Sequence, residues 1–386
     1  MKKNNLIFIL ALFLSLPSMA QEQDTLSRKE ERKAKKVWKE EQGKAMFTPL
    51  VGPAYTPEMG FTVAGGVMIS YKTNPKDSLI QRSSSPIMLG VTSTGGFFAS
   101  SIVTTYWLKD KLRINGDFWI KDMPDNYFGV GYDDGYTTPK SDTTTAYQRS
   151  WWWMNPRFLW QFKPNWFVGV LFDANLTNAS NPSQGVQEDE YYQVYGPKNM
   201  NIGWGLIARY DSRDVPVNAY SGMYVDFRAS FYSKAIGSDN TYQTYELDEL
   251  DVRKYLTIRR PGQTIALQLN TRIGVGEMPY GEMSMIGTPF DLRGYTWGQY
   301  RDESTIFGIA EYRHMFLKGD GTMSKHGFTG WLATGSLGND FSKFHNWLPN
   351  AGIGYRLEVQ PRMNLRIDIG FGRETMGFYF NFNEAF

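Results

Sequence analysis

Few residues of this chain could carry out catalysis. The 386 residues include no cysteine and only three histidines, His314, His326 and His345. A thiol nucleophile, a zinc ribbon and an iron–sulfur cluster are therefore excluded. A hydrolase needs a histidine beside a serine or an aspartate, and we assign these three to strands or a loop. The acidic clusters 188–190 and 248–249 suit either a weak divalent-cation site or a solvated loop. We expect no enzyme activity, no cofactor and no metal site.

The rest of the sequence alternates between apolar and polar residues, which is typical of half-buried β-strands. In 222–232, Val225 and Phe227 fall on one face, whereas Asp226 and Arg228 fall on the other. No amphipathic helix is expected beyond residue 46. The alternation predicts sixteen strands, at 47–55, 60–72, 85–92, 97–107, 111–121, 145–162, 165–178, 199–212, 221–233, 248–259, 263–275, 304–317, 326–335, 350–359, 363–372 and 376–386.

A soluble sandwich would alternate too, but the apolar faces here are often aromatic at their ends, and charges lie on the opposite faces. This is the pattern of a barrel with lipid outside and a polar lumen. The chain has 12 Trp, 23 Tyr and 25 Phe, an excess that two interfacial girdles would explain. Candidates for the girdles are 151–153, Trp160, Trp166 and 191–192. A carbohydrate-binding platform is the alternative interpretation of the clustered tryptophans.

The spacing of the strands predicts one end with long loops. Each long connection joins an odd strand to the next even one, so all lie on the same side of a membrane, outside the cell if the amino terminus is periplasmic. The fold class is therefore all-β, a sixteen-stranded antiparallel transmembrane β-barrel. The long connections are 122–144, 179–198, 234–247, 276–303 and 336–349.

The amino-terminal residues have the composition of a secretory signal. Lys2 and Lys3 precede the apolar stretch 6–16, and Ser18 and Ala20 place small residues at a cleavage site. Such a segment is removed from the mature protein. We expect a signal peptide at 1–20 cleaved near Ala20, a short charged periplasmic leader at 21–46 and the barrel at 47–386.

The leader is rich in charge and contains pairs such as Glu31 and Lys35 that would support a short helix. It is either a solvated segment or a contact for a periplasmic partner or lipid headgroups. Without Lys2 and Lys3 the chain has 39 basic and 39 acidic residues. This balance gives no argument for binding nucleic acid.

Several short motifs occur in the order found in one family of barrels. They are 292–295 (Leu-Arg-Gly-Tyr), 211–216 (Asp-Ser-Arg-Asp-Val-Pro) with Gly222, 311–313 (Glu-Tyr-Arg), 352–356, 365–368 and the carboxy-terminal 378–386. Together they resemble the BamA/TamA superfamily of outer-membrane insertases, also called bacterial surface antigens. The turn-motif residues of this resemblance are Asp211, Arg213, Asp214, Pro216 and Gly222.

The resemblance implies a Gram-negative outer-membrane protein that takes part in protein insertion, translocation or assembly. Its implied partners are lipids including lipopolysaccharide, the assembly machinery and client β-barrels. Members of the superfamily usually carry periplasmic POTRA domains, for which 21–46 leaves no room. We therefore expect an accessory whose clients arrive through a POTRA-bearing partner. The alternative is a passive pore or a structural subunit.

The motif Arg293-Gly294-Tyr295 predicts how the loop 276–303 is held inside the lumen. An arginine in a low-dielectric lumen needs a carboxylate, preferably in bidentate geometry. Glu311 is the natural partner, and Gly294 permits the tight turn that aims the arginine inward. The alternative is an arginine exposed to water. The family commonly offers a second carboxylate where this chain has Ala333, so a second partner for Arg293 is left open.

The carboxy-terminal strand carries aromatic residues at alternate positions, Phe378, Phe380 and Phe382, and the sequence ends with Phe386. This resembles the signal by which the assembly machinery reads outer-membrane barrels in general. It indicates a client of that machinery far more than it indicates a member of it. Glu384 interrupts the alternation.

The resemblance also implies a weak seam between the first and last strands, which could open and pair with a client strand. The first strand supports this expectation, because Pro49, Gly52 and Pro53 weaken strand pairing. Insertion or assembly work and a passive pore are the two hypotheses that the structure must separate.

Overall fold

The computed structural model describes residues 30–31, 34–35, 37–56, 59–77, 80–234 and 243–386. The expected signal peptide lies outside these residues. The described residues between 30 and 41 are helical, as the charge pairs of the expected leader suggested. Among the described residues, no helix has the length and apolar character needed to cross a membrane.

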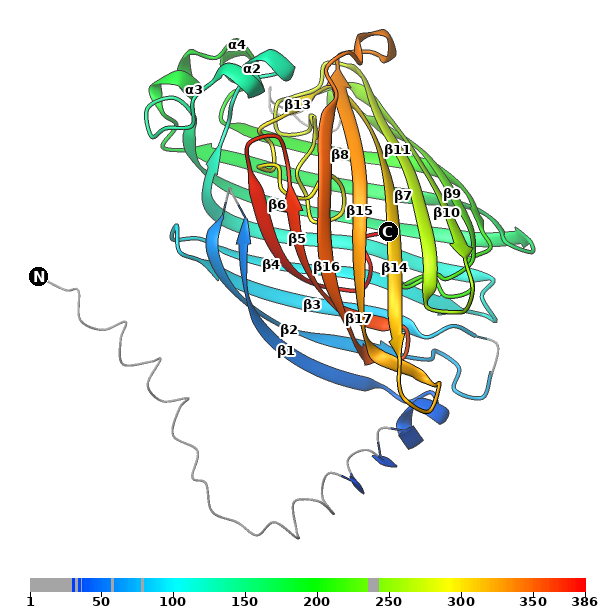
Figure 1. Cartoon of the computed structure of the whole chain (residues 1–386). Helices are drawn as coiled ribbons and strands as arrows, with labels where there is room; N and C mark the ends of the chain where they lie inside the picture. The colour runs from blue at the N-terminus through cyan, green and yellow to red at the C-terminus, as the bar shows by residue number, and fades with distance from the viewer. Residues whose placement is uncertain (1–29, 32–33, 36, 57–58, 78–79, 235–242) are drawn as a thin grey trace, which may run out of the picture.

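Sixteen strands of the described chain close into one antiparallel barrel, in which each strand pairs with its neighbours in sequence and the last pairs with the first (Figure 1). The predicted fold class is confirmed. The strands are β1 (Met46–Thr56), β2 (Gly60–Tyr71), β3 (Ser83–Thr92), β4 (Phe97–Trp107), β5 (Leu112–Asn126), β6 (Ala146–Lys163), β7 (Trp166–Ser180), β8 (Lys198–Asp211), β9 (Gly222–Tyr232), β10 (Tyr245–Thr257), β11 (Gln263–Gly276), β14 (Ser304–Leu317), β15 (Met323–Gly338), β16 (Leu348–Gln360), β17 (Met363–Phe371) and β18 (Met376–Phe382).

The alternation of the sequence sets which side chains face the lumen. On β9, Asp226 is fully buried, whereas the adjacent Phe227 is 45% exposed. Successive side chains of a strand point to opposite faces, so the buried, mostly polar set lines the interior and the exposed apolar set forms the outer surface. Closing the sheet into a barrel pairs strand edges that would otherwise leave main-chain groups unpaired in lipid.

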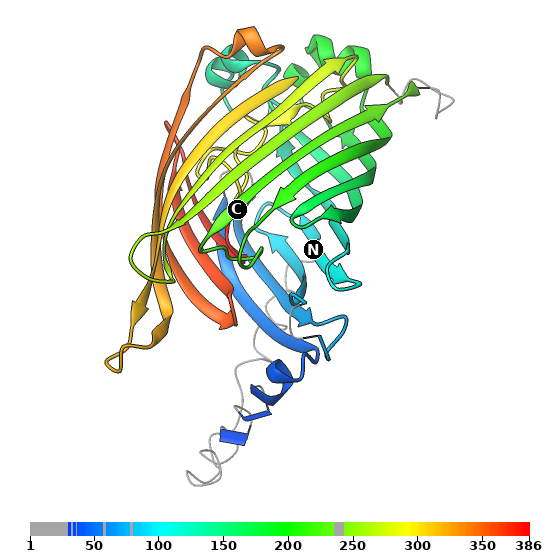
Figure 2. The same cartoon turned by 90° about the vertical axis from the view of Figure 1, so that its right-hand side faces the viewer.

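The remaining elements lie in the long connections at one end of the barrel (Figure 1). Figure 2 shows that the strands are tilted relative to the barrel axis. The end with the long connections, which we call the loop-bearing end, is at the top of this view. The segment 277–303, which we call the inner loop, joins β11 to β14. The elements in the connections are α2 (Tyr132–Thr137), α3 (Gln184–Glu188), α4 (Glu190–Tyr195), β12 (Ser284–Met285), β13 (Arg301–Asp302) and the 3₁₀ helix η3 (Phe341–Lys343).

Some of the predicted girdle residues lie elsewhere. Trp152, Trp160 and Trp166 are exposed on the outer surface. Trp151 is buried and stacks on Trp153 at 5.8 Å between ring centroids, on the lumen side. Three consecutive tryptophans on one strand must alternate between the two faces, so their placement in a single girdle was wrong.

Tyr191 and Tyr192 were also assigned to a girdle, and this too was wrong. Both lie in helix α4 of a loop. Tyr192 is buried, and its ring lies 5.7 Å from that of Tyr280 of the inner loop. These aromatic residues pack the loops against one another at the loop-bearing end.

Candidate functional site

Arg293 joins the inner loop to the barrel wall. Its side chain is fully buried and donates to two carboxylates, Glu311 Oε2 at 2.6 Å and Asp368 Oδ2 at 2.7 Å. The predicted pair with Glu311 is confirmed, and Asp368 of β17 is the second acid that the sequence left open. The guanidinium also lies 3.4 Å from the centre of the Trp331 ring, a cation–π contact on its remaining face.

The two residues after Arg293 fit the loop against the last strands. Gly294 has a φ of 114°, and a Cβ there would lie 2.5 Å from the carbonyl oxygen of Gly370. Only glycine adopts this conformation without strain and permits so close an approach. The Gly294 N–H donates to the Tyr379 hydroxyl at 2.8 Å, and the Tyr295 hydroxyl donates to the Pro349 carbonyl at 2.7 Å.

The contacts of Arg293 belong to a larger group of buried charges, which we call the ion-pair network. Arg356 donates to Asp368 at 2.6 Å and to Glu384 at 2.8 Å, and Arg313 donates to Glu311 at 2.8 Å. Charge-assisted hydrogen bonds of this kind are short and strong. The network consists of Arg293, Glu311, Arg313, Arg356, Arg366, Asp368 and Glu384.

The carboxy-terminal residues do not continue the last strand. β18 ends at Phe382, and Asn383 takes a left-handed φ of 61°. Residues 383–386, which we call the tail, then turn into the lumen. The predicted strand 376–386 was therefore too long, because Glu384 pairs with Arg356 on the inner wall instead of facing lipid.

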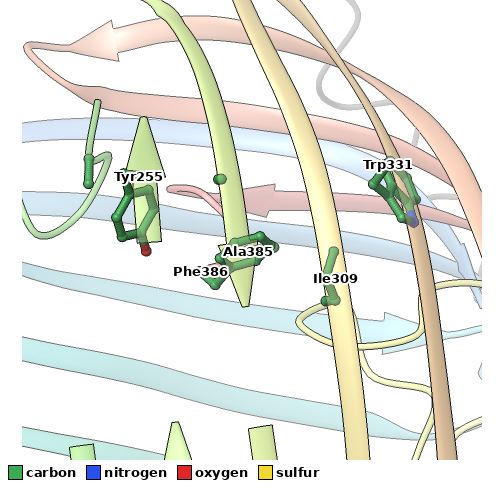
Figure 3. Close-up of a cluster of buried hydrophobic side chains, with 7 residues drawn as sticks. Tyr255, Ile309, Trp331, Ala385 and Phe386 are labelled. Carbon is green, nitrogen blue, oxygen red and sulfur yellow. The ribbon is translucent and has the colours of Figure 1, made fainter. Parts of the chain in front are cut away.

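The tail packs on the inner wall, as Figure 3 shows. Phe386 is 5% exposed and lies with Ala385 in a buried cluster that includes Tyr255, Ile309 and Trp331. Arg313 donates to the main-chain oxygen of Phe386 at 2.9 Å. Phe386 is therefore not one of the strand aromatics of the expected assembly signal.

The other aromatic residues of that expected signal stay in β18. Phe378 is in register with Ile369 of β17, Phe380 is in register with Ile367, and Phe382 is buried against Met68.

The turn motif between β8 and β9 is built around two aspartates. Asp211 accepts two hydrogen bonds from Arg213, at 2.8 and 3.0 Å. Arg213 in turn donates to the Pro216 carbonyl at 3.0 Å. Gly222 has a φ of 108°, and a Cβ there would lie 2.3 Å from the Ser212 carbonyl oxygen. Asp211 also pairs with Arg113 of β5 at 2.5 Å, so the motif fixes the turn and ties it to the neighbouring wall.

Asp214 ties the same turn to the β16–β17 turn through Arg362, with an N–O distance of 2.8 Å. Partial burial opposes the ionisation of Asp214, but the hydrogen bond and charge of Arg362 prevail, so the pKa of Asp214 lies below its ordinary value. The motif therefore joins two turns at the end of the barrel opposite the long loops.

The seam between β1 and β18 has a much shorter ladder than its neighbours. Among the described residues, one pair, Tyr55 and Phe378, is in register across it, whereas β1 and β2 pair along their whole length. Beyond this pair the two strands meet through side chains, because a Cβ at Gly52 would lie 2.6 Å from the Phe380 ring. The predicted weak pairing of the first strand is observed on its β18 side only.

Among the described residues, no cluster of three or more histidine, aspartate or glutamate side chains could hold a metal ion. His314 stacks on Phe328 with 5.2 Å between ring centroids. The ion-pair network contains no histidine.

Sequence reasoning missed three residues that hold Arg293. Asp368 was noted within the motif 365–368 but given no role, and neither Trp331 nor Asn350 was given one. Asn350 donates to the Arg293 carbonyl at 2.6 Å and accepts from Trp331 at 2.9 Å. The alternation of 363–372 placed Asp368 on the inner face, and this was the available signal.

No model of a protein family matches the sequence, and no curated protein matches it. Two solved structures are similar. The crystal structure of BamA from Haemophilus ducreyi lacking POTRA domains 1–3 aligns with a TM-score of 0.52 at 11% identity, covering 88% of this chain and 70% of that one. CdiB from Acinetobacter baumannii aligns with a TM-score of 0.51 at 12% identity, covering 88% of this chain and 59% of CdiB.

The fold predicted from the motifs, that of the BamA/TamA superfamily barrels, is therefore the fold of this chain.

Proposed function

We propose that the protein is an outer-membrane barrel that takes part in the insertion, translocation or assembly of outer-membrane proteins. The observation that carries the proposal is the seam, where one residue pair closes a barrel of this fold. An unpaired stretch of strand edge offers main-chain donors and acceptors to another strand. A client strand can add to β1 or β18 in this way.

The ion-pair network supports this function by keeping the rest of the wall rigid. Arg293 and Gly294 together contact strands β14, β15, β17 and β18, through Glu311, Trp331, Asp368 and Tyr379. The inner loop thus braces the carboxy-terminal side of the seam, while the β1 side lacks such a brace. Opening would then occur by movement of β1 and its neighbours.

The experiment is a disulfide across the seam. Tyr55 and Phe378 are in register, and the chain has no native cysteine, so Tyr55→Cys with Phe378→Cys gives a single defined cross-link. We expect the oxidised variant to reproduce the growth defect and the altered outer-membrane protein composition of a deletion strain. Reduction should restore both.

Matched controls place the same cysteines in ladders that need not open. Phe378→Cys with Ile369→Cys cross-links β18 to β17, and Tyr55→Cys with Phe61→Cys cross-links β1 to β2. Both should support normal growth when oxidised. If growth and outer-membrane protein composition are normal with the seam locked, the proposal is overturned and a passive pore is favoured. For a passive pore, locking the seam should leave the conductance in planar bilayers unchanged.

The finer parts of the proposal concern location and partners. We infer secretion with cleavage near Ala20, contact with lipids including lipopolysaccharide, no enzymatic role, and work as an accessory beside a POTRA-bearing assembly protein. A pull-down of the tagged protein from native outer membranes tests the last point. Recovery of the barrel without an assembly protein would contradict it.

A further inference from the structure

A cavity of about 520 Å³ lies inside the barrel, between the inner loop and the strands on both sides of the seam. Ligand pockets in proteins commonly measure roughly 300–1,000 Å³. The charge of its lining residues differs between the two sides. This difference indicates a ligand class independently of the proposed function.

One side of the cavity is formed by strands without charged residues, and most of its lining is apolar, although Thr62, Ser100, Thr104 and Asn381 also line it. Strands β18, β1, β2, β3 and β4, which we call the uncharged wall, contain no Asp, Glu, Lys, Arg or His along their described lengths. They are contiguous in the barrel. The inner loop adds Phe290 on the same cavity. Apolar side chains that the wall presents to the cavity include Ala64, Met88, Phe98, Ile102 and Phe382.

The other side of the cavity is cationic. Its basic residues are held by aspartates in the wall, as Arg209 is by Asp226 at 2.6 Å, and most of those aspartates do not line the space. The guanidinium groups are therefore what a molecule in the cavity would meet. The basic lining residues are Arg113, Lys121, Arg157, Arg209, Arg213, Arg228 and Arg253.

The two sides meet between β4 and β5. Ile102 of β4 is in register with Asp117 of β5, and Asp117 accepts from Arg157 of β6 at 2.6 Å. Arg157 is 9% exposed, and its buried Nε donates to no group in the described part of the chain. A guanidinium with an unused donor therefore lies at the border of the apolar side.

We propose that this cavity binds an amphipathic anion, a single acyl chain with a carboxylate or phosphate head. The chain lies against the uncharged wall, where burying apolar surface in place of water is favourable. The head accepts hydrogen bonds from Arg157 and its basic neighbours. A small anion would leave the apolar side in contact with water, and a neutral chain would leave the unused Nε donor of Arg157 without an acceptor.

The test uses the full chain purified in a neutral detergent, with dodecanoate as the probe and native mass spectrometry to count bound molecules. One dodecanoate should bind per barrel. Ala64→Trp should fill the apolar side and abolish this adduct. Its control, Val63→Trp, changes the neighbouring residue, which is 47% exposed on the outer surface, and should bind as the unchanged protein does.

The head contact is tested with Arg157→Gln, which should weaken dodecanoate binding about tenfold. Arg259→Gln, at an exposed turn position, should have no effect. The different gel mobility of unheated and heated samples shows which variants are folded.

Three results would overturn the proposal. Equal dodecanoate binding by folded Ala64→Trp would place the probe on the outer surface. Equal binding of acetate would show a site for small anions only, and equal binding of dodecanol would show that the cationic side plays no part. A dodecyl phosphate probe run in parallel distinguishes the head: tighter binding than dodecanoate indicates a phospholipid-derived ligand, and weaker binding indicates a fatty acid.

Discussion

The uncharged wall and the rest of the barrel are held together by different forces. Every strand from β5 to β17 within the barrel carries charged residues, many of them in buried ion pairs, whereas the five strands around the seam carry none. Separating two strands of the charged part would leave buried charges without partners, which costs several kcal/mol. Separating β1 from β18 breaks a short ladder and exposes apolar side chains. The line of easiest opening therefore coincides with the region that lacks charge.

The largest effect is expected from removing the central cation of the charged part. Arg293→Ala leaves Glu311 and Asp368 buried with one partner fewer, and breaking a buried pair in this way costs about 3–5 kcal/mol. The thermal unfolding midpoint in detergent should fall steeply. Arg293→Lys keeps the charge but cannot donate to both carboxylates in the same geometry. Its unfolding midpoint should therefore lie between those of the unchanged protein and Arg293→Ala. An unchanged midpoint for Arg293→Ala would mean that the network does not stabilise the barrel.

A reciprocal exchange compares the two regions directly. Met68 is fully buried on β2, and Met68→Lys places a charge in the uncharged wall without a partner, at a cost of about 3 kcal/mol. Lys121→Met removes a charge from the other region, where Asp125 keeps Arg149 as a partner at 3.6 Å, so no buried carboxylate is left unpaired and the loss should be smaller than for Met68→Lys. Chemical denaturation of both variants measures the difference, and equal losses would erase the distinction between the two regions.

A smaller effect is expected at the close approach between the inner loop and β17. Gly294→Ala puts a methyl group against the Gly370 carbonyl at positive φ, which costs about 1–3 kcal/mol. Limited proteolysis should then cut the inner loop faster. Gly321→Ala has a similar φ of 77° but open space around it, and it should leave the inner loop protected. Equal protection in both variants would show that the close approach is not needed.

The smallest effect is a pH dependence of the inner loop. Burial, with the nearby charge of Asp173, raises the pKa of Glu282 to about 8 against the opposing influence of Arg272, Arg149 and Tyr245. The folded state thus favours the protonated acid. This stabilisation is complete below the unfolded pKa of about 4.5 and declines as the pH rises to about 8.

Hydrogen exchange in the inner loop should therefore become faster between pH 6 and pH 9, after correction for the intrinsic rate. Glu282→Gln should remove this dependence, because an amide does not titrate. The same slope in the variant would assign the effect to another group.

The sequence predicted the strands well because alternation is a local signal. All sixteen ranges were placed, and their ends shifted by a few residues, as at β5, which runs to Asn126 instead of 121. The pair of Arg293 with Glu311 was also predicted, since the family motif contains both. Asp368 was not assigned, because it lies 75 residues from Arg293 in the chain and no local pattern encodes that contact.

Two other predictions were wrong for different reasons. The tail was predicted as strand because aromatic alternation does not reveal a turn at Asn383, and the partner of Glu384, Arg356, comes from another strand. The tryptophans at 151–153 were treated as one group, although strand geometry alone sends Trp152 outward and its neighbours inward.

The ion-pair network also dictates an order of events during biogenesis. The Arg293 pair cannot form before Asp368 is present, and the Arg356 pair cannot form before Glu384, two residues before Phe386, is present. Closing such long stretches of chain is entropically costly until the partners are positioned. A chain that stalls or is cut short before β17 would keep its inner loop undocked. A docked inner loop therefore indicates that the carboxy-terminal strands have been synthesised and placed in the barrel. Proteases that degrade incomplete barrels could recognise the undocked loop.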